Sequence, residues 1–446
     1  MLHSLLRRRQ IRRRDKIKHT RDIFRIALPA IVSNITTPLL GLVDTAISGH
    51  LGAASYLGAI ALGGTLFSTL YMLFGFLRMG TSGLTAQAYG SGDRKAEALA
   101  LWRALAVGTI GAVALLALSP FAAEPVLKLM GPQDETTGEL ALQYFRIVVW
   151  GAPAVLCSYS LSGWFLGMQD SRAPMWMALV TNVVNIGVSL TLVYGLGLKI
   201  EGVALGTVVA QWCGAAYGAY IVWKHFKPDR VSASEITARG ELGKYLRIHF
   251  DIFLRTCCLI AVTLWFTRSG ARAGVDTLAA NALLLQLFLL FSYFMDGFAF
   301  AGEALGGKFH GAGESGAVRS LVRELMITGL ICAVAFGVAY MAGGELIFRL
   351  LSDDEGVRRT AVEYIWWAVA LPFCGFTAFV MDGVMIGLTR TRGMLGALGV
   401  ASIGFFALYY AGTKSGMGNH GLWLAFDAYL AIRGVVEYII VRRSKV

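Results

Sequence analysis

The sequence is poor in charge for its length. Only 15% of its 446 residues are Asp, Glu, Lys or Arg, whereas 56% are hydrophobic and the mean hydropathy is +0.60. A soluble protein of this size needs a charged surface that so few ionisable residues do not supply. The composition therefore excludes an ordinary soluble domain and predicts a membrane protein that crosses the bilayer many times.

Cysteine is also scarce, and its positions follow no ligand pattern. All six cysteines lie inside apolar segments, at spacings that fit neither a zinc site nor a disulfide framework. They are typical of small buried hydrophobic residues. The cysteines therefore predict no metal site. We also expect no bound cofactor and no enzymatic activity. The cysteines are Cys157, Cys213, Cys257, Cys258, Cys332 and Cys374.

The net charge of +12 raises the possibility of a nucleic-acid partner, but the distribution of the charge argues against it. Ten of the Lys and Arg residues precede Pro29, in the stretch LRRRQIRRRDKIKHTRDIFR, and most of the others fall in alternate loops. Such an asymmetry sets the orientation of a membrane protein, with its basic segments on the cytoplasmic side. We therefore expect no nucleic-acid partner and place both termini in the cytoplasm.

Twelve apolar segments long enough to cross a bilayer follow one another along the chain. They predict an all-α polytopic membrane protein with twelve transmembrane helices in two six-helix lobes. The expected divisions are a basic tail 1–22, an N-lobe 23–224, a cytoplasmic linker 225–243, a C-lobe 244–441 and a basic tail 442–446. The expected spans lie near 23–49, 55–80, 96–119, 138–163, 173–195, 200–224, 244–267, 276–302, 317–342, 358–386, 394–412 and 418–441.

The chain repeats itself at the ends of two spans. Gly163-x-x-x-Gly167-x-x-Asp170-x-Arg172 recurs 220 residues later as Gly383-x-x-x-Gly387-x-x-Arg390-x-Arg392. Six spans return the chain to the same side of the membrane, so the two halves have the same orientation. Transporters built from parallel repeats of this kind bind substrate between or within the halves. The small residues themselves predict close helix packing rather than chemistry.

The first span carries the most informative residues. Asp44 is an ionisable group inside a membrane helix, which by default indicates a functional site. Pro29 and Pro38 each remove a backbone donor and favour a bend. Counting back from Asp44 at helical spacing gives a polar face formed by Thr37, Thr36 and Ser33. We predict that Asp44 is a protonation site and that this helix bends.

Other polar residues at membrane depth could line one cavity with Asp44. Each alone is typical of a hydrogen bond between helices, and together they are candidates for substrate contact. Three share one face of the fifth span at helical spacing. The candidates are Tyr144, Ser162, Asn182, Asn185, Ser189 and Thr207.

The second half has its own acids. Asp296, Glu303 and Asp382 are secondary candidates for cation coupling, each open between a structural and a functional role. Asp251 and Arg255 are spaced i, i+4, which predicts a structural ion pair between them. The seventh span has no carboxylate at mid-helix to match Asp44, so the first half is the better candidate for coupling.

Several stretches resemble one transporter family. NITTPLLGLVDTAISGHLG, FLRMGTSGLTAQAYG, MDGFAFAGEA and MDGVMIGLTRTR are similar to the multidrug and toxic compound extrusion (MATE) family, and especially to its prokaryotic DNA-damage-inducible (DinF) branch. The resemblance implies two six-helix lobes in a V, a bacterial inner membrane location and drug export by antiport with H⁺ or Na⁺. It also implies protonation at Asp44, bending at Pro29, and a cavity lined by Tyr144, Asn185 and Thr207. Some members carry a second carboxylate where this chain has Ser189, so a two-carboxylate relay is not expected.

The resulting hypothesis is a monomeric H⁺-coupled antiporter that exports hydrophobic and cationic compounds and contacts membrane lipids. Burial disfavours the charged form of a carboxyl group, so the protonation of Asp44 should follow its exposure to water. A Na⁺-coupled exporter and a flippase for lipid-linked precursors are alternatives. The flippase would need a dense cationic cavity, whereas mid-span arginines are few. A polyprenyl enzyme would need paired acids at the membrane surface, and the adjacent pair Asp353-Asp354 lies in an outer loop.

Overall fold

The computed structural model describes residues 19–36, 41, 43, 46–47, 54–129, 131 and 134–443. These residues are nearly all helical, and no strand occurs among them. Thr37, Pro38 and Asp44 lie outside the described residues. The chain divides into two compact units, the first containing the residues up to Ile31 and from Phe250 onward, the second containing Val32–His249.

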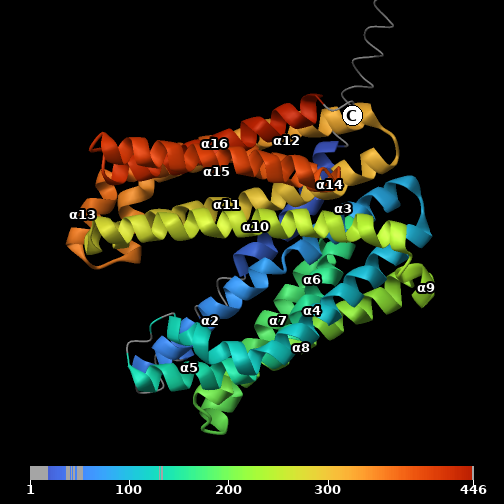
Figure 1. Cartoon of the computed structure of the whole chain (residues 1–446), viewed down its shortest axis with the longest axis horizontal. Coiled ribbons are helices and arrows are strands. Elements are labelled where there is room, and N and C mark those ends of the chain that lie inside the picture. The colour runs from blue at the N-terminus through green and yellow to red at the C-terminus, as the bar shows by residue number, and fades with distance from the viewer. Residues whose placement is uncertain are drawn as a thin grey trace, which may run out of the picture. The chain divides into compact units, whose positions relative to one another are not determined.

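The second unit is built from helices that follow one another along the chain (Figure 1). Its main hydrophobic core includes residues from α2, α3, α5 and α8, with Phe67 and Phe145 stacked at a centroid distance of 4.9 Å. The helices are α2 (Ala54–Leu73), α3 (Phe76–Ser91), α4 (Arg94–Leu129), α5 (Glu135–Val148), α6 (Ala152–Gly167), α7 (Arg172–Leu190), α8 (Ile200–Ile221), the short α9 (Ala233–Ile236) and the beginning of α10 (Arg239–Ala273).

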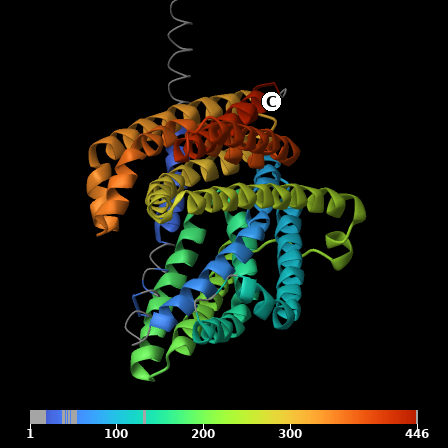
Figure 2. The same ribbon diagram turned by 60° about the vertical axis from the view of Figure 1, so that its left-hand side comes forward.

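The first unit combines the rest of α10 and the helices after it with residues 19–31, the beginning of a helix that runs over residues 19–36. In Figure 2 its orange and red helices lie in a stack, in which α14 packs against α11, α12 and α16, and α15 packs against α16. Its helices are α11 (Val275–Gly311), α12 (Ser315–Leu351), α13 (Glu355–Glu363), α14 (Ile365–Gly387), α15 (Thr391–Lys414) and α16 (Asn419–Arg443).

Ten helical segments among the described residues are long and apolar enough to cross a membrane. They correspond to the second to eleventh predicted spans, so the all-α polytopic fold is confirmed. The predicted first span lies partly outside the described residues. The predicted twelfth span is α16, which is 25 residues long but carries Asp427, Arg433 and Glu437. The count of twelve therefore stays a prediction.

The repeated glycines do the same packing work in both units. A β-carbon on Gly163 of α6 would meet the backbone carbonyl of Arg78 on α3, and one on Gly383 of α14 would meet that of Ala299 on α11. Close backbone approach of this kind requires a residue without a side chain. The prediction that these glycines serve packing is confirmed.

The turns after the two glycine motifs also match. Gln169 and Thr389, 220 residues apart, both adopt a left-handed backbone, with φ of 65° and 52°. The next amide in each copy donates back to the helix: Asp170 N–H to the Phe165 carbonyl at 2.9 Å, and Arg390 N–H to the Met385 carbonyl at 2.8 Å. The sequence repeat is therefore a structural repeat, helix end included.

The compact units divide the chain at other points than the predicted lobes. The first division falls between Ile31 and Val32, inside the first helix and two residues after Pro29. Residues before it contact the first unit: Thr20 Oγ1 donates to Glu324 Oε2 at 3.1 Å, and the Phe24 and Phe298 rings meet edge to face. The lobe boundaries at 224 and 244 stay predictions.

Candidate functional site

The first helix contacts α7 at the end of its described residues, 19–36. The helix is continuous over residues 19–36, with Pro29 in its interior. The Asn182 side chain on α7 donates from Nδ2 to the Thr36 carbonyl at 3.0 Å, and Thr36 Oγ1 donates to the Ser33 carbonyl at 2.8 Å. A side chain of α7 thus holds the backbone of the first helix two residues before Pro38.

A second polar contact lies one turn further along α7. Asn185 is fully buried and donates from Nδ2 to Thr207 Oγ1 on α8 at 3.1 Å. The Thr207 hydroxyl in turn donates to the Val203 carbonyl at 3.0 Å. Asn185 Oδ1 and Ser189 Oγ, also fully buried, have no hydrogen-bond partner among the described residues. Buried polar oxygens without a partner are available to a proton carrier, a cation or a ligand.

The remaining predicted cavity residues lie on other helices of the same unit. Tyr144 on α5 is buried, and its ring packs over Gly63 of α2, where a β-carbon would clash with it. Ser162 on α6 is half-buried. The structure thus joins Asn182 to the first helix and Asn185 to Thr207, and places Tyr144 and Ser162 on α5 and α6.

The first unit contains a buried cluster of charges. Arg255 on α10 and Arg433 on α16 both donate to Asp382 Oδ2 on α14, the second at 3.0 Å. The two guanidinium groups and the carboxylate are almost inaccessible to solvent. A buried charge is tolerated when it is paired and hydrogen-bonded. Asp382 is therefore held between two cations on neighbouring helices.

The predicted pair of Asp251 with Arg255 is wrong. Asp251 accepts a hydrogen bond from Thr391 Oγ1 at 2.8 Å, whereas Arg255 bonds Asp382. The i, i+4 spacing makes a pair of Asp251 with Arg255 possible. In the packed structure, however, the Asp382 carboxylate of α14 lies opposite Arg255 and pairs with it. The preference for an ion pair within α10 could not anticipate the partner on α14.

Two further acids of the first unit were missed by the sequence analysis. Glu437 on α16 is fully buried and interacts with Asp382, and Asp427, also on α16, is buried with neither carboxylate oxygen hydrogen-bonded by any described residue. The available signal was the charge density of the last span, where Asp427, Arg433 and Glu437 interrupt an apolar segment. Ionisable residues at that depth mark functional or paired positions.

The other secondary acids lie on α11. Asp296 is half-buried, and Glu303, at the cytoplasmic end predicted for that span, is buried. Their roles stay predictions. Among the described residues, no group of three or more His, Cys, Asp or Glu side chains is arranged to hold a metal ion.

Comparison with known proteins identifies the family. Residues 29–191 and 248–410 each match the MatE family model, two stretches of equal length that coincide with the two halves of the repeat. The chain belongs to the MatE family. The resemblance found in its sequence motifs is confirmed, and so is its multi-pass membrane character.

The relatives include the DinF branch. The DNA damage-inducible protein F of Escherichia coli (strain K12) is 39% identical over 425 residues, covering 94% of this chain and 92% of the relative. A probable multidrug resistance protein NorM of Thermotoga maritima is 22% identical, covering 76% of this chain and 73% of the relative. The similarity to the first protein confirms the assignment to the DinF branch of the MATE family. At the level of the family, this is a transporter and not an enzyme.

Solved structures share the fold. An outward-facing multidrug resistance MATE family transporter of the MOP superfamily gives a TM-score of 0.82 at 18% identity, covering 94% of each chain. A MATE protein crystallised in a bent conformation gives 0.84 at 18% identity, and one in a straight conformation gives 0.82 at 19%, each covering 95% of both chains. The MATE fold of this chain therefore does not depend on which of these conformations is compared.

Proposed function

We propose that this MatE-family chain exports hydrophobic and cationic compounds across the bacterial inner membrane in exchange for H⁺. The observation that carries the proposal is the similarity to a DinF protein over almost the whole chain, combined with a carboxylate, Asp44, in the first predicted membrane span. A NorM relative and a structurally similar MATE transporter are both described as multidrug resistance proteins, which supports the substrate class.

Asp44 is the proposed protonation site. Water access favours its charged form and burial its neutral form, so proton uptake and release can follow the conformation of the helix. One charge moving through 100 mV supplies about 2.3 kcal/mol, enough to bias a two-state equilibrium by tens of fold. Since Ser189 stands where some relatives carry a second acid, we expect about one proton per cycle.

Bending of the first helix is the proposed conformational step. Pro29 and Pro38 each lack the backbone N–H donor, which weakens a helix at these positions and favours a bend. The division between compact units falls inside this helix, close to Pro29, and Asn182 holds the Thr36 carbonyl close to Pro38. These contacts support a helix that is anchored on both sides of a flexible middle. Bending would change the surroundings of the residues that follow Pro38, Asp44 among them.

The proposed substrate cavity lies in the second unit. The buried oxygens of Asn185 and Ser189 offer acceptors for a cation or a polar substituent. The remaining proposed lining residues supply an aromatic ring and hydroxyl groups, which suits loose binding of varied apolar cations. They are Thr36, Thr37, Tyr144, Ser162, Asn182 and Thr207.

The decisive experiment is transport of a fluorescent lipophilic cation in proteoliposomes, with a pH gradient and a Na⁺ gradient imposed separately. We expect transport with the pH gradient alone, and its loss in Asp44→Asn. The matched control is Asp353→Asn, which removes an exposed carboxylate from the loop between α12 and α13 and should transport normally.

Other results would revise the proposal in defined ways. Transport driven only by Na⁺ would replace H⁺ as the coupling ion. Full activity of Asp44→Asn would move coupling to Asp296, Glu303 or Asp382. Absence of transport under both gradients would contradict the exporter and favour the flippase. Against that alternative, the buried arginines Arg255 and Arg433 of the first unit are already paired with Asp382, so these two are not free to hold a pyrophosphate inside the membrane.

A further inference from the structure

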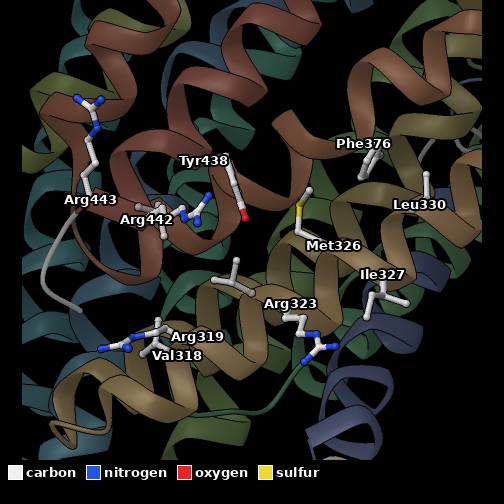
Figure 3. A pocket seen from close by; sticks show the side chains of 12 residues that line it. Val318, Arg319, Arg323, Met326, Ile327, Leu330, Phe376, Tyr438, Arg442 and Arg443 are labelled. Carbon is white, nitrogen blue, oxygen red and sulfur yellow. The ribbon is translucent and has the colours of Figure 1, made fainter.

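A groove opens on the first unit between α12 and α16. Both helices pack against α14, which contributes Phe376 to the lining between them. The cavity has a volume of about 750 Å³, within the range of sites that bind small organic molecules. Figure 3 shows Tyr438 and Arg442 of α16 extending toward this space, with Met326 of α12 on its other side.

The lining changes from charged to apolar along the groove. Figure 3 shows Arg319 and Arg443 toward one side and Leu330 and Phe376 toward the other. The charged end is formed by the first turns of α12 and the last residues of α16, which together contribute four arginines. The four are Arg319, Arg323, Arg442 and Arg443. The apolar part is lined by Met326, Ile327, Leu330 and Phe376.

The length of the groove corresponds to one leaflet. From Arg319 to Leu330, α12 advances about 16 Å at 1.5 Å per residue. Half of the hydrocarbon core of a bilayer is about 15 Å thick. Ile327 and Leu330 are exposed on the unit and so face the lipid phase. A lipid whose headgroup lies at the arginines and whose acyl chain lies beside Ile327 and Leu330 would span one leaflet.

The charge at the mouth is not balanced from within the groove. Arg323, Arg442 and Arg443 make no ion pair with any described residue, and no acid lines the cavity. The nearby Glu324 is buried and accepts hydrogen bonds from Thr20 and Ser320. A negatively charged ligand is therefore complementary to this end, and an apolar one to the other.

We propose that this groove binds an anionic phospholipid of the leaflet at the basic end of the protein, the side predicted to be cytoplasmic. The phosphate lies among the arginines, the Tyr438 hydroxyl reaches the headgroup region, and an acyl chain lies along Met326 and Leu330. Basic pockets between membrane helices recognise lipid headgroups in this way, and tyrosine favours the interface between headgroup and hydrocarbon.

The test measures lipid selectivity of the full-length protein in a zwitterionic bilayer, using spin-labelled phosphatidylglycerol and spin-labelled phosphatidylcholine. We expect a motionally restricted phosphatidylglycerol population that exceeds the phosphatidylcholine one. Each arginine at a membrane surface contributes about fivefold to affinity for an anionic lipid, so Arg323→Gln with Arg442→Gln should lower the selective affinity about 25-fold.

A matched control removes the same charge at the same end of the unit. Arg390 and Arg392 precede and begin α15, which packs against α16 in a helical hairpin, but neither lines the groove. The double change Arg390→Gln and Arg392→Gln should leave the selectivity unchanged. An equal loss in both double variants would show a general surface attraction and overturn the site.

Two further arms separate the lipid from other occupants. Met326→Trp fills the apolar part and should reduce restricted phosphatidylglycerol while leaving the arginines in place. Inorganic phosphate at millimolar concentration should not displace the lipid, because it cannot use the apolar part. Displacement by phosphate, or equal retention of the two labelled lipids by the unaltered protein, would overturn the proposal. Since lipid binding is the readout, the outcome is independent of transport activity.

Discussion

The two units share a packing scheme and differ in the chemistry placed on it. In the second unit the residue before the repeated glycine is Ser162, and the buried contacts nearby are neutral ones between amide and hydroxyl groups. In the first unit the same repeat position is Asp382, fixed by two arginines. The close approach of backbones at Gly163 and Gly383 is the same in both. A duplicated scaffold thus keeps its packing contacts while its polar positions diverge.

This difference separates structural charge from available polarity. The carboxylate of Asp382 is committed to Arg255 and Arg433, so its charge is compensated in place. In the second unit Asn185 Oδ1 and Ser189 Oγ keep open hydrogen-bonding capacity among the described residues. A unit with compensated charges resists rearrangement, and one with open acceptors can accommodate a ligand.

The largest effect is expected from breaking the charge cluster. Arg433→Met leaves the buried Asp382 carboxylate with one fewer cation, which should lower stability by about 3–5 kcal/mol. The loss of stability is measured by thermal unfolding in detergent, monitored as the fraction of protein that stays monodisperse. The control Arg392→Met alters an exposed arginine of the same unit and should stay within about 0.5 kcal/mol. Equal stability of the two variants would show that the cluster is not structural.

The repeated glycines test whether the shared scaffold is equally important in both units. Gly163→Val and Gly383→Val each force a side chain against a facing backbone carbonyl, and each should cost about 1–3 kcal/mol. The control is Gly396→Val, because a β-carbon on Gly396 meets nothing within 4 Å. Unfolding temperatures of the three variants give the comparison, and a large loss in one glycine only would contradict an equivalent role.

A smaller effect is expected from the neutral contact in the second unit. Thr207→Val removes the acceptor of Asn185 and should cost about 0.6 kcal/mol, the average of hydrogen bonds between membrane helices. Thr109→Val is the control, since the Thr109 hydroxyl bonds only the Leu105 carbonyl of its own helix. If the contact positions a substrate, transport should fall in Thr207→Val by more than its stability does. Unchanged transport in Thr207→Val would show that the Thr207 hydroxyl has only a structural role.

The smallest effect is expected at α9, where Glu235 forms an exposed ion pair with Lys95 of α4. The pKa of Glu235 is lowered to about 2. The hydrogen bond from the Lys95 ammonium is the largest cause, and the hydrogen bonds from Ser232 come next. A depressed carboxylate pKa stabilises the folded state above the unfolded value of about 4.3, and this contribution is lost as the pH falls toward 2.

The matching measurement compares unfolding temperatures of the native protein and Lys95→Gln. The difference should be small and constant from pH 7 to pH 5, should decrease below about pH 4, and should be reduced by salt. A difference that grows as the pH falls would contradict the assigned ion pair.

Much of the fold could be predicted from the sequence, because membrane spans are set by runs of apolar residues. Ten of the predicted spans match helices, and the repeat of Gly163 and Gly383 marks the same packing contact twice. The count of twelve stays a prediction where charged residues interrupt a span, as at Asp427 in α16, since composition alone cannot distinguish a buried charge from a solvated one.

The candidate site was predictable in its residue types and less so in its pairing. Asn185 and Thr207 were both selected as polar groups at membrane depth, and the structure joins them. The partner of Arg255 was missed because i, i+4 spacing measures proximity within a helix and gives no information on the neighbouring helix. Asp44, the central prediction, lies outside the described residues and remains to be tested by transport.

By itself, the sequence determined the membrane class, the duplicated organisation and the polar residues open to function, since hydropathy, repetition and residue type are local properties of a chain. Only the tertiary structure decided which charges neutralise one another, which oxygens of Asn185 and Ser189 remain open, and that arginines of α12 and α16 line the same groove. These depend on the packing of helices against α14 and α8, and contacts between helices far apart in the chain are not encoded in any one segment.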